Sequence, residues 1–343
     1  MPTGVIFEES LRLDKSIKII INYLLGPAFL IWLSWDVYHE VTAQEDIGQQ
    51  WQSLVDTIAK KGILPLAAVV LLMFLQWLLE AFKWKLLLKD IIQLHWTAAF
   101  GSILSGISVS VVTPNRLGEF AGRIIHLPNG TRLEGTAFTF MGNLAQMIIT
   151  CLLGSLGLSL GYDILKSQLH SPESVYSIDL LLILAPIASV ILLLVYFSSS
   201  WMLEKLGHWR LLRAFANHLL VLSHTSSGRL TWVMLISFLR YLIFIAQYLI
   251  VFYYCGFSSD PLPLMIGVAV MLLWLSIVPT FSFMEMGVRW QFALLLFPAV
   301  GTNLLAIPLS VTIIWLVNFI LPAILGAFYF LRKPSSQITG ADI

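Results

Sequence analysis

Two stretches of this chain place arginine and glutamate inside otherwise apolar sequence. They read SVVTPNRLGEFAGR (residues 110–123) and SIVPTFSFMEMGVR (residues 276–289). In each, a glutamate precedes an arginine by four residues, which stacks two side chains on one face of a helix. The spacing predicts two ion pairs, Glu119–Arg123 and Glu285–Arg289.

Four arginines fall at membrane depth in the expected spans: Arg116, Arg123, Arg240 and Arg289. Each charge there costs roughly 2.5–3.5 kcal/mol on insertion scales unless it is paired or hydrated. Arg116 and Arg240 have no carboxylate four residues away and thus no obvious partner; Glu80 could serve, but it lies near the cytoplasmic end of its span. An excess of positive charge suits an anionic ligand, for which a lipid phosphate is the natural candidate.

Each of these charges also has a purely structural interpretation. The two ion pairs would hold the interrupted segments closed. Ser282-x-x-Glu285 is a capping-box pattern, so Glu285 would only cap a helix. Arg240 would extend to the membrane interface. These alternatives stay open at the level of sequence.

The prolines predict helix starts inside the membrane. Thr113-Pro114 has the pattern of an N-cap followed by proline in the first turn, and a second start is expected near residues 279–282. Such a start directs free backbone N–H groups toward the membrane centre. The predicted substrate-binding set is therefore Arg116, Glu119, Arg123, Arg240, Glu285, Arg289, Thr113 and Asn143.

Other amides at membrane depth are Gln146, Gln247 and Asn318, which either join helices or contact a ligand. Gly157 and Gly161 form a small-residue face that suggests a homodimer.

The composition defines the elements that must position these residues. Only 11% of the 343 residues are charged and 58% are hydrophobic, whereas soluble domains carry about 25% charged residues. The fold class is therefore an all-α polytopic membrane protein, formed as one domain over 1–343. Full-length spans are expected at 17–35, 63–82 (continuing to 88), 135–160, 178–197, 230–255 and 303–331. Two further segments, 97–126 and 263–298, are interrupted by the charged motifs and are expected to form re-entrant hairpins.

The basic residues predict the topology. With both termini in the cytoplasm and each hairpin returning to its own side, thirteen Lys and Arg lie inside: Arg12, Lys15, Lys18, Lys83, Lys85, Lys89, Arg132, Lys205, Arg210, Arg213, Arg229, Arg332 and Lys333. Only Lys60, Lys61 and Lys166 lie outside. This bias follows the positive-inside rule.

The two motifs align with an offset of 166 residues, at which Ser110, Val112, Glu119 and Arg123 match identical residues. Residues 63–161 and 230–331 are thus predicted to be inverted repeats, a typical transporter arrangement. Residues 36–62 form an external loop whose apolar helical face (Ile47, Trp51, Leu54, Val55 and Ile58) suits the membrane interface. Residues 198–229 form a basic amphipathic segment expected on the cytoplasmic side.

The first motif, TPNRLGE, resembles the Thr-Pro-x-Arg-x-Gly-Glu motif of the transmembrane region of lysylphosphatidylglycerol synthases and their stand-alone relatives. VPTFSFMEMGVR is similar to that family's later Pro…Gly-x-x-Glu motif, although Ser282, Phe283 and Met284 replace its usual glycines. The resemblance implies a flippase that moves a lipid with a phosphate-containing, and in this family aminoacylated, headgroup between leaflets. It corresponds to the translocating region alone, without the soluble synthetase domain.

Two other function classes remain as alternatives. One is an integral-membrane enzyme that acts on lipid phosphates or polyprenyl-linked substrates, although clustered acids or a His/Asp set are not evident. The other is an accessory subunit of a glycosyltransferase. We expect no enzyme activity, no cofactor, no metal and no nucleic-acid partner. The expected partners are a membrane lipid, a second copy of the chain and a separate lipid-synthesising enzyme, and the expected location is the inner (cytoplasmic) membrane.

Overall fold

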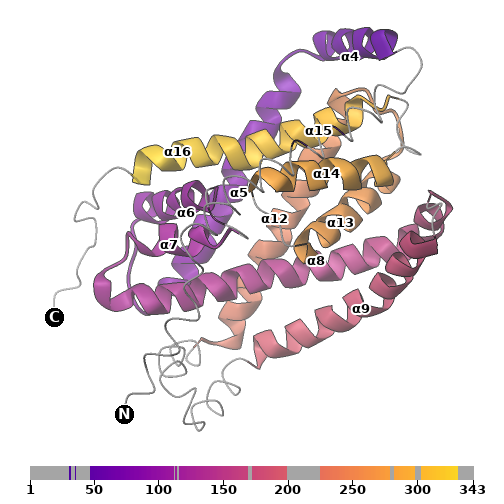
Figure 1. Ribbon diagram of the computed structural model, residues 1–343. Coiled ribbons are helices and arrows are strands. Elements are labelled where there is room, and N and C mark those ends of the chain that lie inside the picture. Colours follow the sequence, from indigo (N-terminus) through magenta and orange to yellow (C-terminus); the bar gives the residue numbers. More distant parts are fainter. Residues whose placement is uncertain are drawn as a thin grey trace, which may run out of the picture.

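The computed structural model describes residues 31, 35, 47–111, 113, 116–168, 172–198, 225–278, 282–297 and 303–330. The elements in these ranges are helices (Figure 1). They are, in chain order, α4 (Ile47–Lys61), α5 (Leu64–Leu88), α6 (Trp96–Ser110), α7 (Gly118–Ile124), η3 (Asn129–Thr131), α8 (Arg132–Gln168), α9 (Pro172–Phe197), α12 (Ser227–Tyr254), α13 (Pro261–Ile277), α14 (Ser282–Leu296), α15 (Ala306–Trp315), η5 (Leu316–Ile320) and α16 (Leu321–Phe330).

The all-α polytopic fold class is confirmed. Within the described ranges, five helical segments are long and apolar enough to cross a membrane: α5, α8, α9, α12 and the continuous α15–η5–α16. They correspond to five of the six predicted spans, and α5 continues to Leu88 as expected. The predicted first span at 17–35, apart from Ile31 and Trp35, and residues 199–224 of the predicted basic segment lie outside the described residues.

Both interrupted segments fold as pairs of short helices, α6 with α7 and α13 with α14. The α6–α7 pair is close because glycines stand at the contact. A Cβ atom on Gly118 would lie 2.4 Å from the Val109 carbonyl oxygen, and one on Gly122 would lie 2.5 Å from that of Ser105. These separations are far below van der Waals contact, so the hairpin tip requires glycine at both positions.

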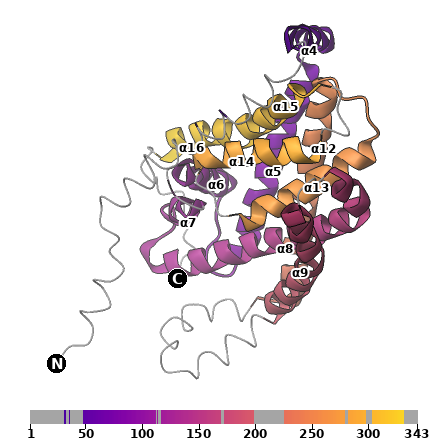
Figure 2. The same ribbon diagram turned by 45° about the vertical axis from the view of Figure 1, so that its right-hand side comes forward.

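The two halves of the chain pack against each other in a reciprocal way. α5 packs along α12, α6 packs on α16 of the other half, and α13 packs on α8 of the first half. α15–α16 and α8 lie on opposite sides of the molecule with the short helices between them (Figures 1 and 2). The short helices therefore occupy the interior, where their charged residues can meet.

Two hydrophobic cores flank this interior. The first contains Met73, Trp84 and Ile103 with Phe319 from the other half. The second contains Tyr248, Met271 and Phe297 with Val69 from the first half. α9 contributes little to either core, and its exposed face carries Leu180, Ile183, Leu184, Ile187, Val190, Ile191 and Leu194, a surface suited to lipid.

The small-residue face of α8 is used within the chain, which corrects its interpretation as a dimer contact. A Cβ atom on Gly157 would lie 2.9 Å from Ala269 Cβ, and one on Gly161 would lie 2.5 Å from Ile266 Cγ2, both on α13. The glycines permit close approach of α8 and α13, the general use of small residues between membrane helices.

Gly157→Leu is therefore expected to destabilise the protein by about 1–3 kcal/mol, the cost of overpacking a close contact. Thermal unfolding of the detergent-solubilised protein would measure this. Gly228→Leu on α12 is the control, because no atom of the described residues lies within 4 Å of a Cβ placed there. Equal melting temperatures for the two variants would contradict the assigned contact.

The predicted helix in the 36–62 loop is confirmed as α4. Its apolar face is divided, because Leu54 is buried against the second core while Trp51 is exposed. The helix is also tied to the membrane helices by Asn303, whose Nδ2 donates to the Gln50 carbonyl at 2.9 Å. α4 thus packs against the rest of the protein through only part of its apolar face. Its position at the membrane interface stays a prediction.

Candidate functional site

A cavity of about 550 Å³ lies among α5, α8, α12, the two hairpins and η5. Among its described lining residues, the charged ones are four arginines and three glutamates: Arg116, Arg123, Arg240, Arg289, Glu80, Glu119 and Glu285. Six of these seven were predicted from the sequence, and Asn143 also lines the cavity. The sequence motifs therefore converge on one space.

The first charged cluster is centred on Glu80 of α5, which is buried. Arg123 of α7 approaches Oε1 of Glu80 at 2.8 Å, and Arg240 of α12 approaches Oε2 at 2.5 Å. Lys83, one turn further along α5, contacts Oε2 at 2.7 Å and donates to the Gly142 carbonyl on α8 at 3.1 Å. The Glu80 carboxylate thus pairs with three cations, from α5, α7 and α12. Lys83 also hydrogen-bonds a fourth helix, α8.

Aromatic rings and a second carboxylate complete this cluster. Glu119 pairs with Arg123, as its spacing predicted. The guanidinium carbon of Arg123 lies 5.8 Å from the ring centre of Trp84, and that of Arg240 lies 5.4 Å from that of Trp77. Cation–π contacts of this kind stabilise arginine away from water.

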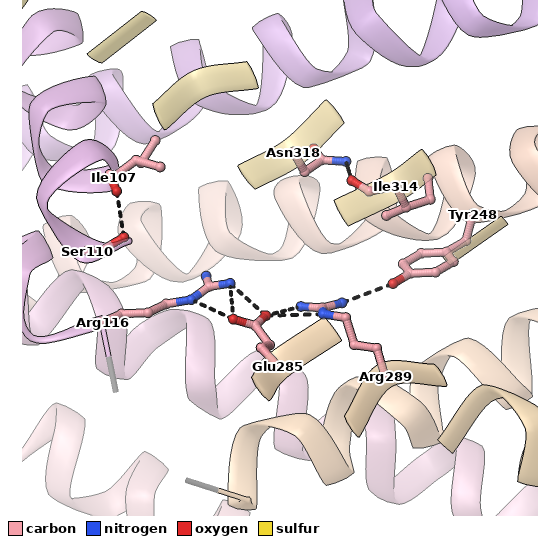
Figure 3. A network of polar contacts seen from close by, with 8 residues as sticks. All are labelled: Ile107, Ser110, Arg116, Tyr248, Glu285, Arg289, Ile314 and Asn318. Atoms are coloured by element: carbon pink, nitrogen blue, oxygen red, sulfur yellow. Dashed lines mark hydrogen bonds and ion pairs between the residues drawn. The ribbon is translucent and has the colours of Figure 1, made fainter. Parts of the chain in front are cut away.

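The second cluster joins the two hairpins (Figure 3). Arg116, from the α6–α7 connection, donates from Nη2 to Glu285 Oε1 at 2.7 Å and from Nε to Oε2 at 3.3 Å. Arg289 donates to the same carboxylate from Nη2 at 2.5 Å, confirming the predicted pair, and from Nη1 to the Tyr248 hydroxyl at 3.1 Å. Glu285 therefore bridges an arginine of its own helix and one from the other half of the chain.

Arg116 has an unusual backbone. Its φ is +56°, in the left-handed region that residues other than glycine rarely adopt. Its guanidinium carbon lies 4.7 Å from the ring centre of Phe319, and its side chain is 42% exposed. This backbone strain costs on the order of 1–3 kcal/mol, and the side-chain contacts to Glu285 and Phe319 offset it.

One expectation about the arginines was wrong, and two structural alternatives are excluded. Arg116 and Arg240 do have carboxylate partners, Glu285 and Glu80, but these come from segments 169 and 160 residues away rather than from the next helical turn. Arg240 does not extend to an interface, because its side chain is 9% exposed and pairs with Glu80. Glu285 contacts two arginines, so its role exceeds that of a helix cap.

Pro114 and Asn115 lie outside the described residues, so the predicted helix start at Thr113-Pro114 stays a prediction; the α-helix α7 begins at Gly118. Thr113 nevertheless serves that start, since its Oγ1 accepts from the Gly118 N–H at 2.7 Å. Thr113 does not line the cavity. The left-handed Arg116 lies two residues before α7, and its side chain contacts Glu285. In the second hairpin α14 begins at Ser282, as predicted.

The membrane-depth amides divide between two uses. Gln146 accepts from Arg240 Nη1 at 3.1 Å within the cavity. Gln247 joins helices by donating to the Val69 carbonyl at 3.0 Å. Asn318 lies in the π-helical turn η5, where Nδ2 donates to the Ile314 carbonyl at 3.1 Å (Figure 3). Such turns frequently mark functional sites.

The set of residues predicted from the sequence left out Glu80, Lys83 and Gln76. Glu80 was assigned to the cytoplasmic end of its span, and Lys83 was counted among the cytoplasmic charges, yet both side chains are 1% exposed. Twelve of the charges predicted inside remain against three predicted outside, so the predicted bias persists and the topology stays a prediction. The three-residue spacing of Glu80 and Lys83, with Gln76 one turn earlier, was the available signal.

The cavity is positive. Its four described arginines and three glutamates give a charge of +1, and Lys83 behind Glu80 raises this to +2. Each glutamate is already held by at least one arginine. An anion entering the cavity would meet guanidinium groups, whose planar N–H donors match phosphate.

Comparison with known proteins gives one match. The family described as the lysylphosphatidylglycerol synthase TM region matches residues 19–326, which is nearly the whole chain. The search of curated proteins and the search of solved structures give no match.

Proposed function

Because the chain belongs to the lysylphosphatidylglycerol synthase transmembrane-region family, we propose that it is a lipid transporter that moves a phosphate-containing lipid between membrane leaflets. The observation that carries this proposal is the cavity in which four arginines meet at membrane depth. Charged groups in such positions usually mark a substrate pathway.

The arrangement of the arginines suits a headgroup in transit. Arg240 and Tyr248 belong to different clusters and lie eight residues apart on α12, which separates them by about 12 Å along the helix. A phosphate could exchange between the clusters in short steps. At each step the phosphate would replace a carboxylate as partner of an arginine, so that no guanidinium is left unpaired.

The hairpins supply an element that could move. Arg116 and Glu285 are the contact through which the tip of one hairpin holds the other. A phosphate that takes Arg116 from Glu285 would loosen this contact. We propose that residues 63–161 and 230–331 act as inverted repeats that open the cavity alternately to each leaflet, as in transporters built from broken helices.

The proposed setting follows from the charges and the family. The protein is a transporter rather than an enzyme, located in the inner membrane with both termini in the cytoplasm. Its lipid is supplied by a separate lipid-synthesising enzyme. A second copy of the chain remains a partner to be tested by mass measurement in detergent.

Arg240→Ala tests the proposal. Glu80 keeps Lys83 and Arg123 as partners in this variant, so the protein should fold. Loss of one charge-assisted hydrogen bond to phosphate, about 1.5–3 kcal/mol, should slow transport roughly 10- to 150-fold. The measurement is dithionite quenching of a fluorescent anionic phospholipid in vesicles that contain the purified protein.

Arg229→Ala is the matched control on the same helix, because Arg229 pairs with Asp90 and does not line the cavity. It should transport at the unmodified rate. If the unmodified protein moves lipid no faster than protein-free vesicles, or if Arg240→Ala and Arg229→Ala are equally active, the proposed function is wrong.

A further inference from the structure

The partners already present in the cavity restrict the headgroups that it can accept. Glu80 holds three cations, Glu285 holds two, and Glu119 pairs with Arg123. A headgroup ammonium could reach Glu80 or Glu285 only by displacing an arginine or lysine, because both oxygens of each carboxylate are already paired. The cavity thus offers a second positive charge only Glu119, which it would share with Arg123.

Aromatic faces are the other sites that bind cations, and two in this cavity are also in use. Arg240 covers Trp77 at 5.4 Å, and Arg116 covers Phe319 at 4.7 Å. These two rings are therefore not free to bind a headgroup cation. The net charge of +2 on the cavity also opposes a cationic headgroup, because like charges repel strongly where the dielectric constant is low.

Uncharged polar groups are, by contrast, available. Gln76, Tyr241 and Asn318 line the cavity and are 0%, 3% and 6% exposed. Both amide atoms of Gln76, the Tyr241 hydroxyl and the Asn318 Oδ1 have no hydrogen-bond partner among the described residues. Buried polar groups are rarely left unpaired in native proteins, so these atoms point to a ligand that donates and accepts hydrogen bonds.

These groups are placed beside the phosphate-binding arginines. Gln76 is one helical turn from Glu80 on α5, Tyr241 follows Arg240 on α12, and Asn318 precedes Phe319, which contacts Arg116. The Nε atoms of Arg123 and Arg240 also lack partners among the described residues. Anion donors and neutral hydrogen-bonding groups therefore share one cavity.

We propose that the headgroup carried through this cavity is a phosphodiester that bears uncharged hydroxyl groups, a polyol or sugar phosphate, and that an aminoacylated, cationic headgroup is disfavoured. The inference rests on the proposed lipid transport and specifies its substrate. The phosphate binds the arginines, and the hydroxyl groups bind Gln76, Tyr241 and Asn318.

Three acyl-labelled fluorescent lipids test the inference in vesicles that contain the full-length protein. Phosphatidylglycerol carries one negative charge and two hydroxyl groups, phosphatidylpropanol has the same charge and chain length without hydroxyl groups, and lysylphosphatidylglycerol adds an aminoacyl cation. Two hydrogen bonds at about 1 kcal/mol each predict that phosphatidylglycerol moves roughly 30-fold faster than phosphatidylpropanol. It should also move faster than lysylphosphatidylglycerol.

Two variants connect this preference to the named groups. Gln76→Leu and Tyr241→Phe should each reduce the ratio of phosphatidylglycerol to phosphatidylpropanol rates by roughly 2- to 10-fold, the effect of one hydrogen bond. Tyr241→Phe removes only an oxygen atom, so it retains the packing if Gln76→Leu fails to fold. Gln247→Leu is the matched control, because Gln247 is equally buried but does not line the cavity. Its ratio should equal that of the unmodified protein.

The outcomes separate the two proposals. If phosphatidylpropanol moves as fast as phosphatidylglycerol, the preference for hydroxyl groups is wrong. If lysylphosphatidylglycerol moves as fast as phosphatidylglycerol, the exclusion of a cationic headgroup is wrong. In both cases lipid transport stands. A ratio unaffected by Tyr241→Phe also overturns the inference. If none of the three lipids moves faster than in protein-free vesicles, both proposals fail.

Discussion

Glu80→Gln is expected to lower the free energy of unfolding by about 3–5 kcal/mol, the cost of breaking a buried ion pair by removing one partner. The variant keeps the shape of the side chain but leaves Lys83, Arg123 and Arg240 without the carboxylate that joins them. Among the described residues, only Arg123 of these three retains another ion-paired carboxylate, that of Glu119. Thermal unfolding of the protein in detergent, followed by size-exclusion chromatography, would measure the loss.

Charge compensation distinguishes this cause from a general loss of packing. Adding Lys83→Met to Glu80→Gln removes one of the uncompensated cations, so part of the lost stability should return. Asp90→Asn is the control, since Asp90 is 51% exposed in its pair with Arg229 and should cost about 0–1 kcal/mol. A Glu80→Gln protein that melts like Asp90→Asn would show that the buried cluster does not stabilise the fold.

The contrast between predicted and missed ion pairs illustrates what sequence can establish. Glu119–Arg123 and Glu285–Arg289 were predictable because helical geometry alone brings residues four apart together. Arg116–Glu285 and Arg240–Glu80 depend on how helices far apart in the sequence pack. Periodicity contains no information on that packing, so the same arginines were wrongly considered unpaired.

Local geometry limits the other predictions. The cap signature at Thr113-Pro114 did not predict that Arg116 is left-handed or that the α-helix α7 begins at Gly118, and Pro114 itself lies outside the described residues. The Gly157–Gly161 pattern correctly predicted a close helix contact, yet a pattern on one helix does not identify its partner, which is α13 of the same chain. Span positions were predicted well because about 20 apolar residues are needed to cross a bilayer.

A double-mutant comparison at Arg116 and Glu285 should separate structural pairing from substrate binding, the question that sequence left open. Arg116→Ala leaves Glu285 paired with Arg289, and the Arg116 side chain is 42% exposed, so the loss of stability should be small. Transport of a fluorescent anionic lipid should nevertheless fall roughly 10- to 150-fold, since a guanidinium–phosphate contact contributes about 1.5–3 kcal/mol.

Glu285→Gln should have the opposite signature, a clear loss of stability, because Arg116 and Arg289 then face each other across an uncharged amide. Combining it with Arg116→Ala removes that repulsion, and the melting temperature should recover toward that of Arg116→Ala. Transport should remain low, because the arginine that binds phosphate is still absent. If the double variant recovers transport together with stability, Arg116 serves only to hold the hairpins together, and the phosphate must be bound by Arg123, Arg240 and Arg289 alone.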